Sequence, residues 1–272
     1  MDDLYRDAAN DANNGRVETS FTFDEKALLS AMKRIYSGKL NVSKEIEENL
    51  WRETYRILTE ATDEGLSESG REIDVQFRRK VDYNNAVFSA FKVHRMQNDI
   101  ATQLHDSNGD LKPFEQWKKD VEPMLDHHVG SWLKTEYDTT VIRIHQAADW
   151  QRFEENADIM PHLEWMPSTS LHPGEDHRIF WHTILPVNHT FWDRHRPGNR
   201  WNCKCWLENT DAPATEVPDS SMAKNDRPSP GLDNNPGKDG KLFSDSHPYV
   251  ANCYGGAPET VKEFMEKQKN LS

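Results

Sequence analysis

Residues 24–158 carry apolar positions at helical spacing. From Asp24 to Tyr36 the apolar residues recur every three or four positions, and Asp24 suits an N-cap. A second helix is expected to begin at the cap Ser43 and to end before Gly65. A third is expected over residues 84–104, before the polar turn 106–110. This part of the chain is therefore predicted to begin with three amphipathic helices.

Two more helices are expected before the pattern changes. One starts near Pro113, a residue that suits the first position of a helix. The other follows Gly130 and extends to Phe153, with apolar residues near i, i+4 and i+7. No alternation typical of strands occurs before residue 160. The first half is thus predicted to be an all-α layer.

After Met160 the chain becomes rich in proline and short apolar pieces. We expect brief strands or turns at Ile179–Trp181, Thr183–Leu185 and Lys204–Leu207. Residues 208–240 are rich in Pro, Asn, Asp and Gly, which indicates a linker or extended arm, and a final helix is expected over residues 258–268.

Together these patterns predict an α+β protein that is predominantly α-helical. The predicted organisation has four parts: a flexible arm 1–23, a helical region 24–158, a small Cys/His/Trp-rich module 159–207, and an arm with a closing helix 208–272.

Composition narrows the classes of function. The net charge of −13 disfavours a general nucleic-acid coat, which needs cations to neutralise phosphates. No run of about 18 apolar residues encodes a membrane span, and the acidic N-terminus lacks the apolar core of a secretory signal. Three cysteines, two of them one residue apart, do not form a disulfide framework. A reducing cytoplasm is the simplest compartment.

The stretch from His177 to Cys205 is the densest in aromatic and metal-capable side chains. It also holds an excess of cations in an otherwise acidic chain: Arg178, Arg194, Arg196, Arg200 and Lys204. These cations could bind DNA phosphates or an acidic partner, although a solvated face is the default for such a run. The aromatic residues could stack on a partner or form a small core.

Four residues of this stretch could bind zinc. His177, His195, Cys203 and Cys205 offer the imidazoles and thiolates of a Cys₂His₂ site, which would stabilise a segment poor in regular structure. The single residue between the cysteines is shorter than the usual spacing of two to four. The alternative is that both thiols are reduced and pack in a core.

An enzymatic hypothesis also has a sequence motif. His162-Leu163-Glu164, followed by the Cys203/Cys205 pair, is similar to the H-x-E … P-C-x-x-C signature of zinc deaminases, but the pair is one residue short and no proline precedes it. A nuclease belongs to the same class of alternatives. The chain holds no Gly-rich phosphate loop, no G-x-S-x-G and no H-E-x-x-H motif. We therefore expect no enzyme.

The order of motifs resembles a known family. The run TEYDTTVIRIHQAADWQRFEENADIMPHLEW, then His177, then LPVNHTFWDRHRPGNRWNCKC, is similar to the minor head proteins typified by protein F of phage Mu. The resemblance covers about residues 131–250 and depends most on an F-W-D-x-H … W-x-C-x-C core. The matched motif residues include Trp150, Phe191, Trp192, Asp193 and Trp201.

The resemblance implies a head-morphogenesis protein of a tailed phage or prophage. Such a minor capsid protein is expected to contact portal and capsid proteins, with contact to packaged DNA as a further expectation. It is expected in the virion and, during assembly, in the host cytoplasm. The same module also occurs fused to toxin domains, but nothing in residues 1–130 looks catalytic.

Overall fold

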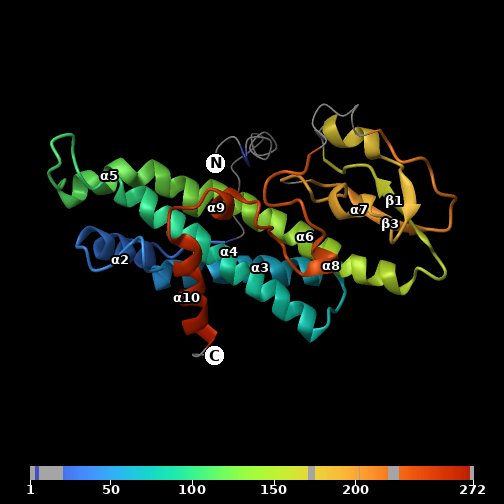
Figure 1. Ribbon diagram of the computed structural model, residues 1–272, viewed down its shortest axis with the longest axis horizontal. Coiled ribbons are helices and arrows are strands. Elements are labelled where there is room, and N and C mark those ends of the chain that lie inside the picture. Colours follow the sequence, from blue (N-terminus) through green and yellow to red (C-terminus); the bar gives the residue numbers. More distant parts are fainter. Residues whose placement is uncertain (1–3, 6–20, 171–174, 202, 220–226, 270–272) are drawn as a thin grey trace. The chain divides into compact units, whose positions relative to one another are not determined.

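The computed structural model describes residues 4–5, 21–170, 175–201, 203–219 and 227–269 (Figure 1). It confirms the predicted fold class, since helices dominate and one small antiparallel sheet accompanies them. The helices of the first half are α2 (Glu25–Tyr36), α3 (Glu48–Ser69), α4 (Val75–Ala101), α5 (Phe114–Leu125) and α6 (Trp132–Glu155), with a π-helical turn (Asp126–Ser131) before α6. The later elements are β1 (His162–Met166), a 3₁₀ helix (Glu175–Phe180), β2 (Ile184–Pro186), α7 (Phe191–Arg194), β3 (Trp206–Thr210), α8 (Pro236–Asp239), α9 (Pro248–Ala251) and α10 (Ala257–Lys269).

The N-cap of α2 is the predicted one. The side chain of Asp24 accepts hydrogen bonds from the backbone N–H groups of Lys26 and Ala27, which satisfies two donors that the first turn leaves open. The start predicted for the second helix at Ser43 is wrong. Instead, the Glu47 carboxylate accepts the Leu50 N–H at 2.9 Å, and α3 begins at Glu48.

Gly65 does not end α3, contrary to prediction. A β carbon at this position would overlap the Val141 carbonyl oxygen and the Ile144 side chain of α6. The glycine therefore permits close helix packing, and the helix continues to Ser69. The α4 helix also begins earlier than predicted, at Val75, because the Asp74 carboxylate accepts the N–H groups of Gln76 and Phe77.

The three strands form one antiparallel sheet in the order β2-β1-β3. Leu163 pairs with Leu185 on one side and with Asn209 on the other. Two of the predicted strand positions overlap β2 and β3. The third, Ile179–Trp181, forms no strand: Ile179 and Phe180 end the 3₁₀ helix, and Trp181 lies in the turn that follows.

One apolar cluster joins the sheet to α6 and α7. Its larger side chains include those of Trp150, Trp165, Phe180 and Trp192, all fully buried. Both thiol side chains of Cys203 and Cys205 belong to the same cluster. The dense aromatic segment therefore supplies a core, as one of the two sequence interpretations held.

The predicted arms contribute buried residues. Of the arm 1–23 only residues 4–5 and 21–23 are described, and Tyr5 is buried with its hydroxyl donating to Glu136. In the predicted arm 208–272, Leu232, Leu242 and Phe243 are almost fully buried. The term "extended arm" therefore does not describe residues 231–247.

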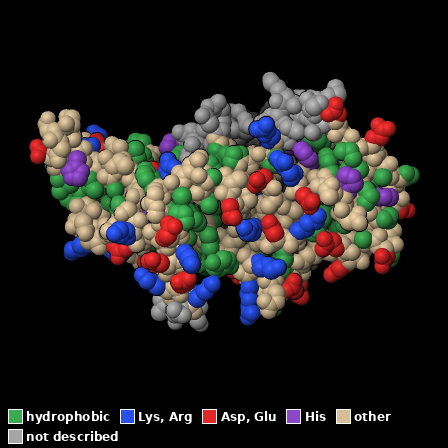
Figure 2. All heavy atoms as spheres, in the orientation of Figure 1, with side chains coloured by type: hydrophobic (Ala, Val, Ile, Leu, Met, Phe, Trp, Pro, Cys, Tyr) green, Lys and Arg blue, Asp and Glu red, His purple; other side chains and the backbone are tan. Residues whose placement is uncertain are grey.

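The chain divides into two compact units, and neither is continuous in sequence. The first comprises residues 1–17, 61–82 and 135–247, and contains the sheet. The second comprises residues 18–60, 83–134 and 248–272. On the face drawn in Figure 2, acidic and basic side chains are interspersed. Within the described residues, every helix is too short or too polar to cross a membrane.

Candidate functional site

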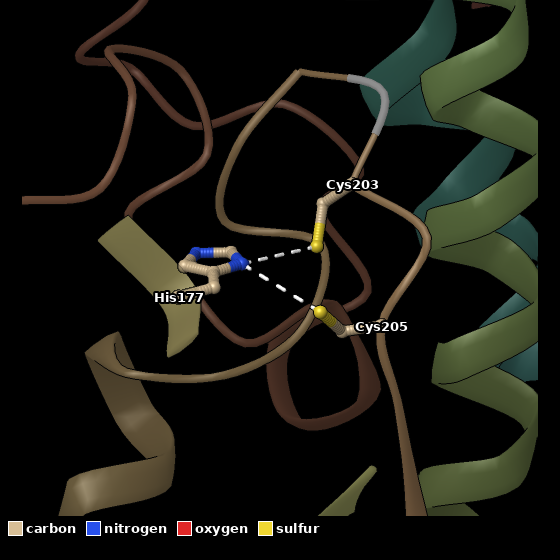
Figure 3. A group of neighbouring side chains, drawn as sticks. All are labelled: His177, Cys203 and Cys205. Atoms are coloured by element: carbon tan, nitrogen blue, oxygen red, sulfur yellow. Dashed lines mark hydrogen bonds between the residues drawn. The ribbon is translucent and has the colours of Figure 1, made fainter. Parts of the chain in front are cut away.

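Three of the four predicted metal ligands lie together. The Nδ1 atom of His177 lies 3.3 Å from the sulfur of Cys203 and 3.9 Å from the sulfur of Cys205 (Figure 3). All three ligand atoms lie within 4.8 Å of one another. For a tetrahedral zinc ion with the usual Zn–N and Zn–S bond lengths, the nitrogen-to-sulfur distance is about 3.5 Å. The spacing of the three atoms therefore fits one four-coordinate metal ion.

The pairing of β3 explains how a C-x-C spacing supplies two ligands. Met166 of β1 pairs with Trp206, and the Thr169 N–H donates to the Lys204 carbonyl, so the chain is already paired before β3 begins. In extended chain, alternate side chains point to the same side. Cys203 and Cys205 are accordingly both buried, whereas Lys204 between them is exposed. The short spacing does not keep the two sulfurs apart.

His195 is not part of this group, and its assignment as a ligand needs correction. Its ring stacks on Phe191, with 5.1 Å between centroids, and packs against Phe180 at 5.4 Å. Among the described residues, the cluster of potential ligands consists of His177, Cys203 and Cys205 alone. The imidazole of His195 instead extends the aromatic core beside the site.

Hydrogen bonds orient His177. Its Nε2 atom lies 2.8 Å from Oδ1 of Asn199, and Nδ2 of Asn199 donates to the Arg194 carbonyl at 2.8 Å. Asn199 and His177 are both buried, at 1% and 4% exposure. The His177 and Trp165 rings also pack edge to face, with 5.1 Å between centroids. The ring is therefore fixed on the side away from the thiols.

The two thiols differ in acidity because they share one hydrogen bond. The Cys205 thiol donates to Cys203, and this bond, together with the nearby His177, holds the pKa of Cys203 well below its ordinary value. The same bond and burial raise the pKa of Cys205. The neighbouring Trp165 and Trp181 partly oppose that rise in the Cys205 pKa. Cys203 is therefore the thiol that reaches the thiolate state more readily, and thiolates are the form that binds metals.

The site is enclosed on the histidine side. The thiols point toward His177 in Figure 3, and all three ligand side chains are at most 9% exposed. A cavity of about 320 Å³ lies between α6 and the Cys203–Leu207 segment, but His177 is not among its lining residues. His177 is therefore enclosed as in structural zinc sites, whereas Cys203 and Cys205 both line the cavity.

The deaminase-like residues do not join the site. His162 and Glu164 lie on β1, and the Glu164 carboxylate contacts Nδ1 of His182 at 2.8 Å. Neither residue belongs to the cluster of potential ligands that the described residues form. The arrangement of a zinc-bound His with a neighbouring proton-shuttling Glu is therefore not built from this motif.

The basic residues separate into a buried one and more accessible ones. Arg196 is 1% exposed, and its Nη1 donates to Oδ1 of Asn235 at 2.8 Å. Its assignment as a DNA or partner contact is therefore wrong, since a buried guanidinium cannot reach a phosphate. Arg178, Arg194 and Lys204 are exposed, and Arg200 is half-buried.

The aromatic motif residues all lie in the first unit. Trp150, Phe191 and Trp192 belong to the core that surrounds the thiols. Trp201 stacks on Phe243 instead, with 5.9 Å between centroids. The last motif residue, Asp193, is half-buried and pairs with Lys238.

Sequence reasoning missed several residues that build the site. Arg143 on α6 is fully buried, and its guanidinium donates to the Gly198 carbonyl and to Asn234. The sequence signal that could have indicated its burial is its position as an arginine within an apolar helical stripe. Asn199 and Trp165 had no signal beyond their place in the motif.

Comparison with protein-family models, with curated proteins and with solved structures returned no match for this chain.

Proposed function

We propose that the sheet-containing unit is a zinc-stabilised structural module and that the protein acts in phage head assembly through protein contacts. The observation that carries the first part is the convergence of His177 Nδ1 with the sulfurs of Cys203 and Cys205 inside an aromatic core. Two thiolates and a neutral imidazole form a soft donor set, which suits zinc. Zinc would then join the 3₁₀ helix to the segment before β3.

A structural role is favoured over catalysis by burial and by the composition of the cluster. The three side chains are buried, and the cluster contains no carboxylate among the described residues. A hydrolytic zinc site needs a bound water within reach of substrate and commonly a general base. The enclosed His–Cys–Cys group offers neither feature on its histidine side.

The role in head assembly rests on the motif resemblance. Its support from the structure is that distant motif residues meet in one core: Trp150 from α6, Trp192 from α7, and Cys203 and Cys205 beside β3. A core of this kind stabilises a docking module. The partners that we propose are the portal and capsid proteins, with the protein present in the virion and, before that, in the host cytoplasm.

The metal proposal is tested by elemental analysis of the purified full-length chain. We expect about one zinc per chain. Cys203→Ser should abolish that stoichiometry and lower the thermal midpoint, because a ligand that binds only the folded state stabilises it by about 4 kcal/mol at a thousandfold excess over Kd. Cys253→Ser is the matched control, since Cys253 lies outside the cluster. A metal-free protein that is equally stable with either substitution would refute the proposal.

The assembly role is tested separately. Co-expression with the portal protein of the same genome, followed by size-exclusion chromatography, should give a co-migrating complex. Mass spectrometry of purified particles should detect the chain at low copy. Failure of both experiments, with portal and particles otherwise intact, would contradict the assembly role and leave the metal proposal standing.

A further inference from the structure

The side chain of Asn199 has only one orientation that satisfies its contacts. Its amide lies between the Arg194 carbonyl, 2.8 Å from Nδ2, and the His177 ring, 2.8 Å from Oδ1. Amide orientation is assigned from the hydrogen-bond network, and a carbonyl oxygen can only accept. The NH₂ group must therefore face Arg194, which leaves the amide oxygen facing Nε2 of His177.

An amide oxygen facing Nε2 fixes the tautomer of the imidazole. Because Oδ1 can only accept, Nε2 must carry the proton of the neutral ring. The lone pair then lies on Nδ1, the atom that faces the two sulfurs at 3.3 and 3.9 Å. In neutral histidine, the hydrogen bond made by one ring nitrogen determines which nitrogen binds a metal.

We infer that Asn199 is the positioning residue of the proposed metal centre, which selects Nδ1 of His177 as the metal-binding nitrogen. This inference rests on the zinc site proposed above. Metal-bound histidines commonly donate their other N–H to an oxygen acceptor, and loss of that acceptor costs 10- to 100-fold in metal affinity. Burial of Asn199 to 1% exposure means that water cannot easily replace its amide oxygen.

The chain order supports the same assignment. Asn199 lies four residues before Cys203, in the turn that follows α7, and its backbone N–H donates to the Arg196 carbonyl. The carbonyl that orients its amide belongs to Arg194, the last residue of α7. The same turn therefore provides the Asn199 amide oxygen that accepts from His177 and the Arg194 carbonyl that orients this amide.

The experiment measures zinc affinity by chelator competition in the wild type, Asn199→Ala and Asn199→Asp. We expect Asn199→Ala to lose 10- to 100-fold in affinity. Asn199→Asp keeps an oxygen acceptor for Nε2–H but lacks the N–H that binds Arg194, so its affinity should stay within about threefold of the wild type. If Asn199 served only to hold the turn, both substitutions would weaken binding equally, and that result would overturn the inference. Asn209→Ala, in β3, is the matched control for loss of an asparagine side chain.

A measurement on the unaltered chain keeps the inference testable if the variants fail to fold. Long-range ¹H–¹⁵N NMR of the zinc-loaded protein, with His177 assigned by His177→Gln, reports the protonation of each ring nitrogen. A protonated Nε2 with a metal-shifted Nδ1 is expected, and a protonated Nδ1 would overturn the inference. A wild-type chain that binds no zinc would instead refute the proposed function, so the two failures can be told apart.

Discussion

Gly237 lies directly against the side chain of Trp150. A β carbon on Gly237 would overlap Cβ and Cγ of the tryptophan, so no larger residue fits without movement of α6 or of α8. Trp150 is fully buried in the core around the thiols, and α8 starts at Pro236 after the N-cap Asn235. This contact joins α8 to the core around the thiols of Cys203 and Cys205.

The close approach predicts a large effect of a single methyl group. Gly237→Ala should destabilise the first unit by about 1–3 kcal/mol, because overpacking forces neighbouring groups from their positions. Gly130→Ala is the control, since a β carbon there meets nothing within 4 Å. Urea unfolding followed by tryptophan fluorescence measures both. Equal stability of the two variants would show that the Trp150 contact is not tight.

Two buried arginines should respond differently to the same substitution. Arg143 donates to Gly198 and Asn234, with a longer contact to the Leu232 carbonyl, whereas Arg196 donates to Asn235. Burial lowers the pKa of Arg143 to about 10 and that of Arg196 to about 9.

Arg143→Met should lower the free energy of unfolding by about 2–4 kcal/mol, because buried acceptors are left without a donor. Arg196→Met should cost less than half as much. The Oδ1 atom of Asn235 still accepts the Gly237 N–H, so this acceptor keeps a donor when Arg196 is replaced. Thermal and urea unfolding of the two variants check the ranking. A larger loss at Arg196 would contradict the assignment of Arg143 as the main anchor.

His128 should make the second unit sensitive to acid. It is 1% exposed, and burial lowers its pKa to about 4, despite a contact from Nε2 to Asp99 at 3.2 Å. Nearby Lys92 and Arg95 lower the pKa of His128 further. An unfolded histidine titrates near pH 6.5, so the unfolded state binds more protons between pH 6.5 and 4.

The sign follows from that difference in bound protons. The contribution of the neutral, buried His128 to the free energy of unfolding should be fully present above pH 6.5. It should fall by about 3 kcal/mol as the pH drops to 4. His128→Gln should remove this contribution to the slope, whereas the exposed neighbour His127→Gln should keep it. Unfolding free energies at several pH values between 4 and 7 provide the measurement. Parallel slopes in both variants would mean that His128 is not responsible.

Binding to DNA, if the module contacts it, should depend on accessible cations only. Arg194→Gln and Lys204→Gln should each weaken a salt-dependent DNA shift and reduce the salt slope by about one. Arg196→Lys should leave the slope unchanged, because its side chain is buried. Titrations at 50 to 200 mM salt distinguish the two groups. An unchanged slope in all three variants would exclude a phosphate contact at these positions.

The local sequence determined the positions of several helices and the N-cap of α2, because these features depend on residues close together in the chain. The helical spacing and the cap Asp24 predicted α2, and α5, α6 and α10 also appear where expected, since helix signals lie within a few turns. The α3 helix was cut short at Gly65 because the reason for that glycine is a contact with α6, which no local pattern contains.

At the candidate site, the residue types that could bind a metal were evident from the sequence. Which of these side chains lie together was not. His177 and His195 were both predicted as ligands, and the packing of the 3₁₀ helix places only His177 beside the thiols. The orientation of its ring depends on Asn199, and the burial of Arg196 depends on Asn235 far along the chain. Local sequence determines helix periodicity and donor chemistry, whereas long-range packing decides which side chains meet and which remain accessible to solvent.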